Sequence, residues 1–115
     1  MIDIAEGKNA VVYARQVIEE FVRNNKLPDC TLSGIFKEKQ GAFVTIHTFP
    51  SHDLRGCIGI PLPVMSLKDA IVEGATSATH DPRFSALSEK ELDSIIIEVT
   101  ILSPVSYTHL RAHET

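Results

Sequence analysis

The sequence has few of the features that mark several large classes of protein. Its 115 residues hold two cysteines and no tryptophan, and the formal net charge is -4 without any basic run. A chain without basic clusters is poorly suited to binding nucleic acid through phosphate contacts. No apolar stretch approaches the roughly 20 residues that a membrane-spanning helix needs, so we expect no membrane span. Residues 1–8 show no basic region followed by an apolar one, so no secretory signal is visible.

The two cysteines, Cys30 and Cys57, do not have the spacing of a metal site. Without a secretory signal we interpret them as free thiols in a reducing compartment, which predicts a cytoplasmic protein. Paired cysteines near paired histidines are absent, so we expect no metal and no cofactor. Gly-rich phosphate loops, nucleotide fingerprints and Ser/His/Asp signatures are absent as well. Hydrophobic content of 43% suits one domain with a packed core.

The remaining residues follow clear helix and strand patterns. Apolar side chains recur at spacings of three and four over residues 7–24, which predicts a helix. Runs rich in β-branched residues predict strands over 42–49 and 54–60, joined by a short turn as an antiparallel hairpin. A serine cap predicts a second helix over 66–79, and residues 94–102 read as a strand that is apolar on both faces. We therefore expect an α+β fold with both helices packed on a mainly antiparallel sheet.

Residues 54–59 carry the sequence LRGCIG, the clearest indication of a site. Glycine is unfavourable inside a strand unless the backbone bends there or another group comes close. Strand alternation predicts that Arg55 and Cys57 share one face. A thiol beside a guanidinium ionises more easily than a lone thiol. The motif therefore predicts a functional site, although it does not name the chemistry.

Each residue of the motif has a structural alternative beside its functional interpretation. Cys57 is a candidate nucleophile or redox thiol, or else a small buried hydrophobic residue. Arg55 is a candidate for binding a carboxylate or phosphate through its fork, or else pairs with an acidic residue. Gly56 and Gly59 either admit a ligand close to the backbone or only form a bulge.

Histidines and a turn supply the other candidates. His80 is a candidate base for Cys57, or else a favourable charge at the end of a helix. His47 and His52 are further candidate bases or ligands, with a purely structural role as the alternative.

The turn over residues 81–84 follows the second predicted helix. Asp81 is suited to accept backbone N–H groups, and we expect Phe84 to enter the core. Arg83 either faces the same cleft as Arg55 or is a surface charge. A capping-box pattern that begins at Ser88 predicts a further helical turn.

Several of these segments occur together in one known family. The LRGCIG motif, residues 75–78, the turn 81–84 and the strand 97–104 occur in the order found in the AMMECR-type domain family. The chain resembles the shorter microbial form of this family over roughly residues 7–105. The resemblance implies an α+β fold of two subdomains with a cleft between them. Microbial members are often encoded beside, or fused to, a Memo-like protein and a radical S-adenosylmethionine protein, so it also implies these partners.

The end of the chain departs from the family pattern. Members of the family continue well beyond the strand 97–104, whereas residues 106–115 have no period and resemble a read-through segment found on metagenomic sequences. We expect residues 1–105 to form a partial AMMECR-type domain, and residues 106–115 to be a non-native tail that packs loosely.

Two hypotheses about function follow. In the first, a cleft lined by Arg55, Cys57, His80 and Arg83 binds a small anionic ligand or supports a reaction that the sequence does not identify. In the second, the domain is a non-catalytic interaction module that works with Memo-like and radical S-adenosylmethionine proteins, and residues 54–59 serve packing or contact. Whether the protein is an enzyme stays open at this point.

Overall fold

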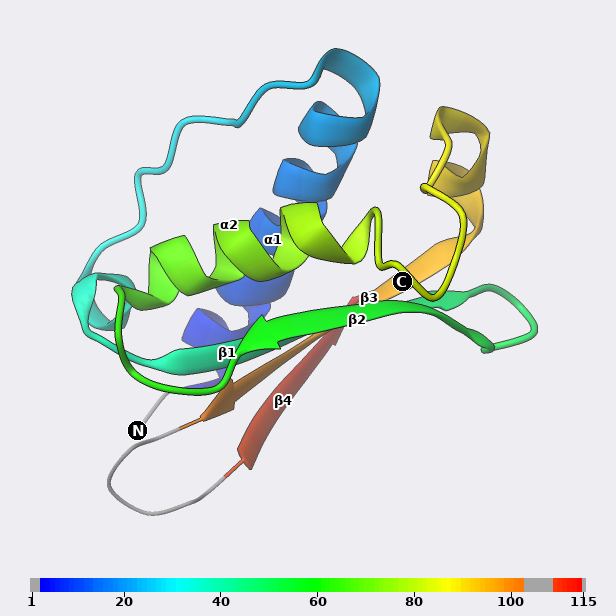
Figure 1. Cartoon of the computed structure of the whole chain (residues 1–115). Helices are drawn as coiled ribbons and strands as arrows, with labels where there is room; N and C mark the ends of the chain where they lie inside the picture. The colour runs from blue at the N-terminus through cyan, green and yellow to red at the C-terminus, as the bar shows by residue number, and fades with distance from the viewer. Residues whose placement is uncertain (1–2, 103–108, 115) are drawn as a thin grey trace.

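The computed structural model describes residues 3–102 in full and the backbone of residues 109–114. The elements in chain order are α1 (Ile4–Asn24), η1 (Gly34–Lys37), β1 (Gly41–Thr48), β2 (Leu54–Ile60), α2 (Leu67–Ala78), η2 (Glu89–Ser94), β3 (Ile95–Leu102) and β4 (His109–Glu114). Within these residues the strands form one antiparallel sheet in the order β2-β1-β3-β4, and the two α-helices lie over the same face (Figure 1). The predicted α+β class is confirmed.

Helix α1 is fixed at its start by a reciprocal cap. The Asp3 side chain accepts a hydrogen bond from the Glu6 amide at 2.7 Å, and the Glu6 side chain accepts one from the Asp3 amide at 3.1 Å. This capping box starts the helix at Ile4 instead of residue 7, because polar caps precede the apolar period that predicted the helix. At the other end Asn25 adopts a left-handed conformation with φ 53°, which stops the helix where it was predicted.

Strands β1 and β2 form the predicted hairpin, but with an irregularity at the motif. Ile46 pairs with Gly56, whereas the next residue, His47, pairs with Leu54. Arg55 is therefore an extra residue on β2, which makes a β-bulge. Strict alternation of side chains does not continue across a bulge, so the faces of Arg55 and Cys57 cannot be read from spacing alone.

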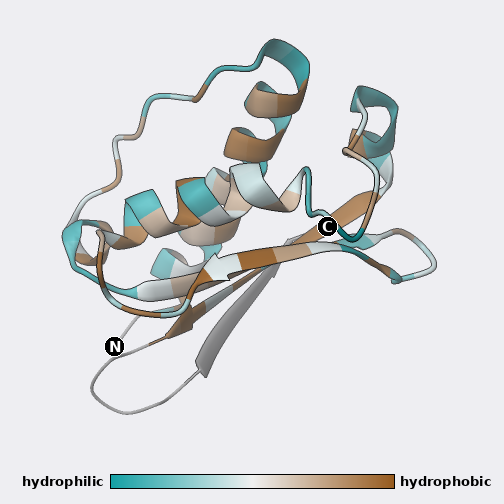
Figure 2. Ribbon diagram, in the orientation of Figure 1, coloured by the Kyte–Doolittle hydropathy of each residue, from teal (hydrophilic) through white to brown (hydrophobic). Residues whose placement is uncertain are grey.

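Helix α2 lies unusually close to the hairpin because two glycines leave room for it. A Cβ atom on Gly56 would lie 2.4 Å from the Ala78 carbonyl oxygen, and one on Gly74 would lie 3.0 Å from the Ile58 carbonyl oxygen. Val44 and Ile46 of β1 are fully buried beneath the helices. Figure 2 shows the apolar segments that meet in this layer along β2, β3 and both helices.

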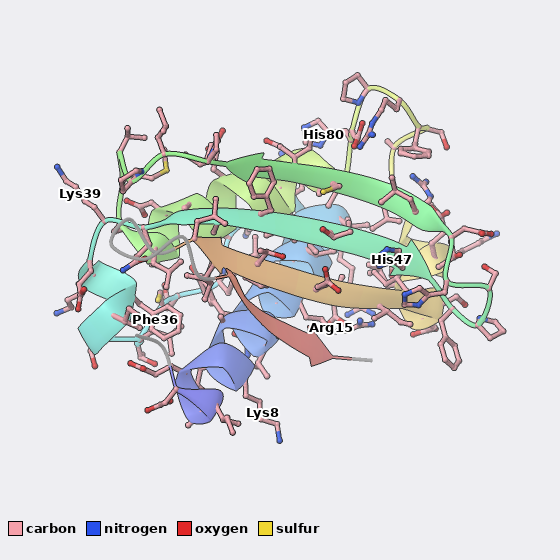
Figure 3. The ribbon with its side chains drawn as sticks, turned by 90° about the horizontal axis from the view of Figure 1, so that it is seen from below. Lys8, Arg15, Phe36, Lys39, His47 and His80 are labelled. Carbon is pink, nitrogen blue, oxygen red and sulfur yellow. The ribbon has the colours of Figure 1, made fainter. Side chains whose placement is uncertain are left out.

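Strand β3 is buried on both faces, as its sequence predicted. Ile97, Val99 and Ile101 belong to the core under the helices. Ile96 and Thr100 alternate with them and are only 7% and 9% exposed. No helix of the described residues covers this second face of the sheet, which Figure 3 views from below.

The final strand differs from what the sequence predicted. The backbone of His109–Glu114 pairs with β3 from Leu102↔His109 to Ile97↔Glu114, although no regular element was expected after residue 105. An edge strand can recruit a neighbour through backbone groups alone, which requires no side-chain period. Residues 103–108 and 115 lie outside the described residues. That the tail is non-native stays a prediction.

Candidate site at the edge of strand β2

The turn after α2 lies against the outer edge of β2. The Cys57 amide donates a hydrogen bond to Asp81 Oδ2 at 3.0 Å, and Arg83 Nη2 donates one to the Cys57 carbonyl oxygen at 3.4 Å. These are backbone groups that a neighbouring strand would otherwise satisfy. Asp81, Arg83 and the backbone of Cys57 are called the edge clamp below.

Asp81 is the centre of the edge clamp. Its side chain is only 1% exposed and also accepts hydrogen bonds from the Arg83 amide at 3.0 Å, from Nε at 3.1 Å and from Nη2 at 2.7 Å. These bonds from the guanidinium, followed by those from the Arg83 and Cys57 amides, lower the pKa of Asp81. The expected role of Asp81 as an acceptor of backbone N–H groups is confirmed, and its carboxylate stays ionised at neutral pH.

Arg83 is held on one side and open on the other. Its Nε and Nη2 atoms make the bonds to the edge clamp, while Nη1 makes no hydrogen bond within the described residues. The side chain is 57% exposed, and its pKa is raised first by hydrogen bonding to Asp81. Its Cζ atom lies 5.5 Å from the centre of the Phe84 ring. Arg83 thus presents one edge of a fixed guanidinium to solvent.

Phe84 does not enter the core as expected. It is half-buried against Arg83, whereas Leu87 is the buried residue at 7% exposure. The Leu87 amide donates to the Thr79 carbonyl oxygen at 2.7 Å, which draws this part of the chain back under α2. The Phe84 ring was expected to anchor the turn in the core, but this part of the turn lies outside it.

Cys57 lies in a setting between the two predicted alternatives. It is half-buried, and its Sγ atom lies 3.3 Å from Thr45 Oγ1 on the opposite residue of β1. Thr45 alternates with Val44 and Ile46, which pack toward the helices, so the thiol lies on the sheet face that no described helix covers. The thiol is neither enclosed in the core nor fully exposed.

Arg55 forms the ion pair that was its structural alternative. Its Nε and Nη2 atoms donate to the two carboxylate oxygens of Glu91 at 3.0 Å each, and the side chain is 12% exposed. Nη1 and Nη2 also donate to the carbonyl oxygens of Ser85 and Ala86 at 2.8 Å and 3.3 Å. The hydrogen bond from Arg55 is the largest cause of the lowered pKa of Glu91. Arg55 therefore ties β2 to η2 and to the segment before it.

The cation next to Cys57 is Arg83, where the sequence predicted Arg55. Arg83 binds the Cys57 carbonyl, and an electrostatic interaction with Cys57 is the smallest of the causes that raise the pKa of Arg83. The bulge explains the difference, because it removes Arg55 from the alternation that was used to place it. Arg83 belongs to the turn after α2, where the chain reverses and returns to β2. Local spacing within the motif could not predict this contact.

The histidines are not brought to the thiol. His80 is exposed, stacks on Phe21 with ring centres 5.7 Å apart, and has Nδ1 3.0 Å from Thr79 Oγ1. His47 and His52 stack on each other at 4.4 Å, and His47 Nδ1 is buried without a hydrogen-bond partner in the described part of the chain. Figure 3 shows His80 beyond the edge of β2 and His47 at the hairpin end of β1. No described hydrogen bond links any of the three to Cys57.

The two glycines of the motif face protein atoms instead of open space. Gly56 adjoins the Ala78 carbonyl, and a Cβ on Gly59 would lie 2.4 Å from the Ala42 carbonyl oxygen and 2.6 Å from the Phe43 ring. Both positions are therefore explained by close packing of α2 and β1, and by the bulge beside Gly56.

One residue important to this region, Glu91, was not singled out from the sequence as a site residue. Glu91 was seen only as part of a capping box, which it does form with Ser88, and its second role as the partner of Arg55 left no local signal.

Among the described residues, no group of three or more His, Cys, Asp or Glu side chains is placed to hold a metal ion. Nor does that part of the chain contain a helix both long and apolar enough to cross a membrane.

Comparisons with known proteins converge on one family. The family model described as AMMECR1 matches residues 11–114. The chain is 48% identical to Protein MJ0810 of Methanocaldococcus jannaschii over 105 residues, covering 90% of this chain and 52% of that protein. It is 45% identical to Protein Mbar_A1807 of Methanosarcina barkeri over 120 residues, covering 99% and 58%. The chain spans little more than half the length of these curated relatives.

A solved structure shares the fold. The crystal structure of the uncharacterized protein PH0010 from Pyrococcus horikoshii matches with a TM-score of 0.83 and 35% sequence identity. The match covers 90% of this chain and 54% of that one. The arrangement of helices and sheet described above is therefore that of a known fold. This chain matches about half of the length of the solved protein.

Proposed function

The chain belongs to the AMMECR1 family, and we propose that it binds a small anionic ligand at Arg83, next to Cys57. The observation that supports this proposal is the half-engaged guanidinium of the edge clamp. A carboxylate that is 1% exposed holds Nε and Nη2, while the side chain as a whole is 57% exposed and Nη1 makes no bond within the described residues.

The edge clamp prepares Arg83 for this role. An arginine side chain loses rotamer freedom when it binds, and this loss is smaller when the guanidinium is already fixed. The ion pair with Asp81 and the contact with Phe84 hold the group in one orientation. Nη1 can still donate a charge-assisted hydrogen bond to a carboxylate or phosphate oxygen. Because Asp81 already balances the charge, we expect weak binding, in the millimolar range.

The position of Cys57 sets what such a ligand encounters. Its carbonyl is bound by Arg83, and its thiol lies on the uncovered sheet face beside Thr45. A bound anion and the thiol would therefore meet at one edge of the sheet.

The test is a titration followed by amide NMR. Inorganic phosphate, added against chloride at matched ionic strength, should give saturable shifts at the Cys57 and Arg83 amides. Arg83→Gln should abolish saturation, and Arg83→Lys should weaken it because the charge remains but the guanidinium that Asp81 holds in one orientation is lost. Arg23→Gln is the matched control, because Arg23 is also exposed and paired with acidic residues. Saturation that persists in Arg83→Gln, or that phosphate and chloride produce equally, would contradict the proposal.

A second function is supported by the uncovered face of the sheet. Thr45, Ile96 and Thr100 lie there beneath no described helix, although each is less than 10% exposed. The chain also covers only 52% of a relative such as Protein MJ0810. The alternative proposal is that the full protein is an interaction module for Memo-like and radical S-adenosylmethionine proteins. In a full-length relative, the equivalent of Thr45→Lys should then abolish binding to those purified partners, and that of Arg83→Gln should not.

A further inference from the structure

A cavity of about 380 Å³ lies away from the edge clamp, between the segment that follows α1 and the start of α2. Its volume is within the range of small-molecule sites. The cavity is lined by Cys30, Leu32, Phe36, Lys37, Ser66 and Lys68, and is called the α2 pocket below. Phe36, on η1, lies at the end of the molecule away from His47 (Figure 3).

The α2 pocket combines an apolar surface with positive charge. The apolar surface comes from Cys30 and Leu32, which are half-buried against the core, because Phe36 is only 2% exposed. Both charged lining residues are lysines. Lys37 forms no ion pair within the described residues. Lys68 pairs with Asp69 at 3.5 Å, with the two side chains 41% and 58% exposed, and solvent-accessible pairs of this kind contribute little. Lys68 is therefore available to a competing anion.

The start of α2 adds to this positive character. The amides of Leu67 and Asp69 donate to the Glu38 carbonyl oxygen at 2.8 Å and to Ser66 Oγ at 3.2 Å, and the Ala70 amide donates to the Ser66 carbonyl oxygen at 2.9 Å. The Lys68 amide alone in this first turn has no acceptor among the described residues. A helix of 12 residues also carries a positive partial charge at this end.

A neighbouring tyrosine does not offset this charge. Tyr13 and Cys30 line a second cavity of about 170 Å³, which shares Cys30 and Leu32 with the α2 pocket. Burial raises the pKa of Tyr13 to about 12, and the electrostatic interaction and hydrogen bond with Cys30 act in the same direction. The phenol therefore stays neutral at physiological pH.

We propose that the α2 pocket binds a small anionic amphiphile, with a carboxylate held by Lys37 and Lys68 and an apolar body packed on Leu32 and Cys30. Two cations around an apolar surface match a ligand that carries one anionic head on a hydrocarbon body. Neither a bare inorganic anion nor a neutral hydrocarbon satisfies both parts of the pocket. The site is independent of the edge clamp, with which it shares no residue.

Cys30 provides a local readout for the test, because it lines the pocket. In a Cys57→Ser variant only Cys30 is left to react with N-ethylmaleimide. Octanoate, below the concentrations at which it forms micelles, should slow this reaction saturably. Octanamide, which has the same chain without the charge, should protect far less.

The lysines are tested in the same assay. Lys37→Gln with Lys68→Gln should weaken protection by octanoate roughly tenfold. The same exchange at Lys26 and Lys90, which do not line the pocket, should change nothing. Because none of these lysines is buried, circular dichroism melts should show all variants equally folded.

Three results would overturn the proposal: no protection by octanoate, equal protection by octanamide, or full protection in the Lys37 and Lys68 double variant. Arg83→Gln separates this site from the edge clamp. If it leaves protection of Cys30 intact, the two sites are distinct. If it removes protection, octanoate acts through the edge clamp and the α2 pocket is not its site.

Discussion

Replacing Gly56 with alanine tests whether the motif glycine serves packing or ligand approach. The new Cβ would lie 2.4 Å from the Ala78 carbonyl oxygen, a distance that real Cβ atoms essentially never show. The obstacle is backbone at the end of α2, so relief requires the helix or β2 to move by about half an ångström or more. Overpacking of this kind costs about 1–3 kcal/mol. We therefore expect Gly56→Ala to lower the melting temperature by about 4 °C or more.

Gly74→Ala is the graded comparison. Its Cβ would lie 3.0 Å from the Ile58 carbonyl oxygen and 3.2 Å from a methyl group of Val44, so the overlap is smaller. Alanine is also favoured over glycine inside a helix by about 1 kcal/mol, which offsets part of the crowding. Thermal and urea unfolding should therefore rank wild type and Gly74→Ala close together and Gly56→Ala clearly below.

The competing explanation makes the opposite forecast. If Gly56 exists to let a ligand approach, Gly56→Ala should melt like wild type and lose only the phosphate-dependent NMR shifts. That combination would refute the packing argument. Loss of stability with binding retained in the remaining folded protein would support it.

Three further predictions concern the two arginines and their partners. Arg55→Met should destabilise the fold by about 1–3 kcal/mol in urea unfolding, because a carboxylate and two backbone carbonyls lose their donors. Since the pKa of Asp81 is lowered on folding, its stabilising effect is present above the ordinary carboxyl pKa near 4 and lost as pH falls below it. Stability measured at pH 7 and pH 3 should thus differ less in Asp81→Asn than in wild type. Cys57 should react with iodoacetamide in the folded protein when the other cysteine is serine, and Arg83→Met should alter this rate more than Arg55→Met; reaction only after unfolding would exclude an accessible thiol.

Local signals were enough to predict most of the fold. Ser66 does cap α2, β2 has the predicted bounds of 54–60, and the capping box at Ser88 does begin a helical turn, η2. Each depends on a few adjacent residues, so spacing and residue type are sufficient. The start of α1 was misplaced because Asp3 and Glu6 cap it through polar groups outside the apolar period.

The site was harder to predict because its contacts join distant parts of the chain. Arg55 and Glu91 are 36 positions apart, and the Cys57 amide meets Asp81 across 24 positions. No local period records such pairs. The bulge added a second difficulty, since one extra residue on β2 invalidates the alternation used to place Arg55 beside Cys57. The family resemblance located the segments involved but not these contacts.

The two arginines show how the same residue type can serve structure in one place and recognition in another. Arg55 is 12% exposed, with both edges of its guanidinium bound to a carboxylate and to backbone carbonyls, so a ligand would have to displace existing bonds. Arg83 is 57% exposed, whereas its ion-pair partner Asp81 is only 1% exposed. Burying a lone carboxylate is costly, and the guanidinium and two amides that meet Asp81 offset this cost. That task uses only Nε and Nη2, because those two atoms reach both carboxylate oxygens. The outer Nη1 makes no hydrogen bond within the described residues, so it is the donor that the proposed anion would use.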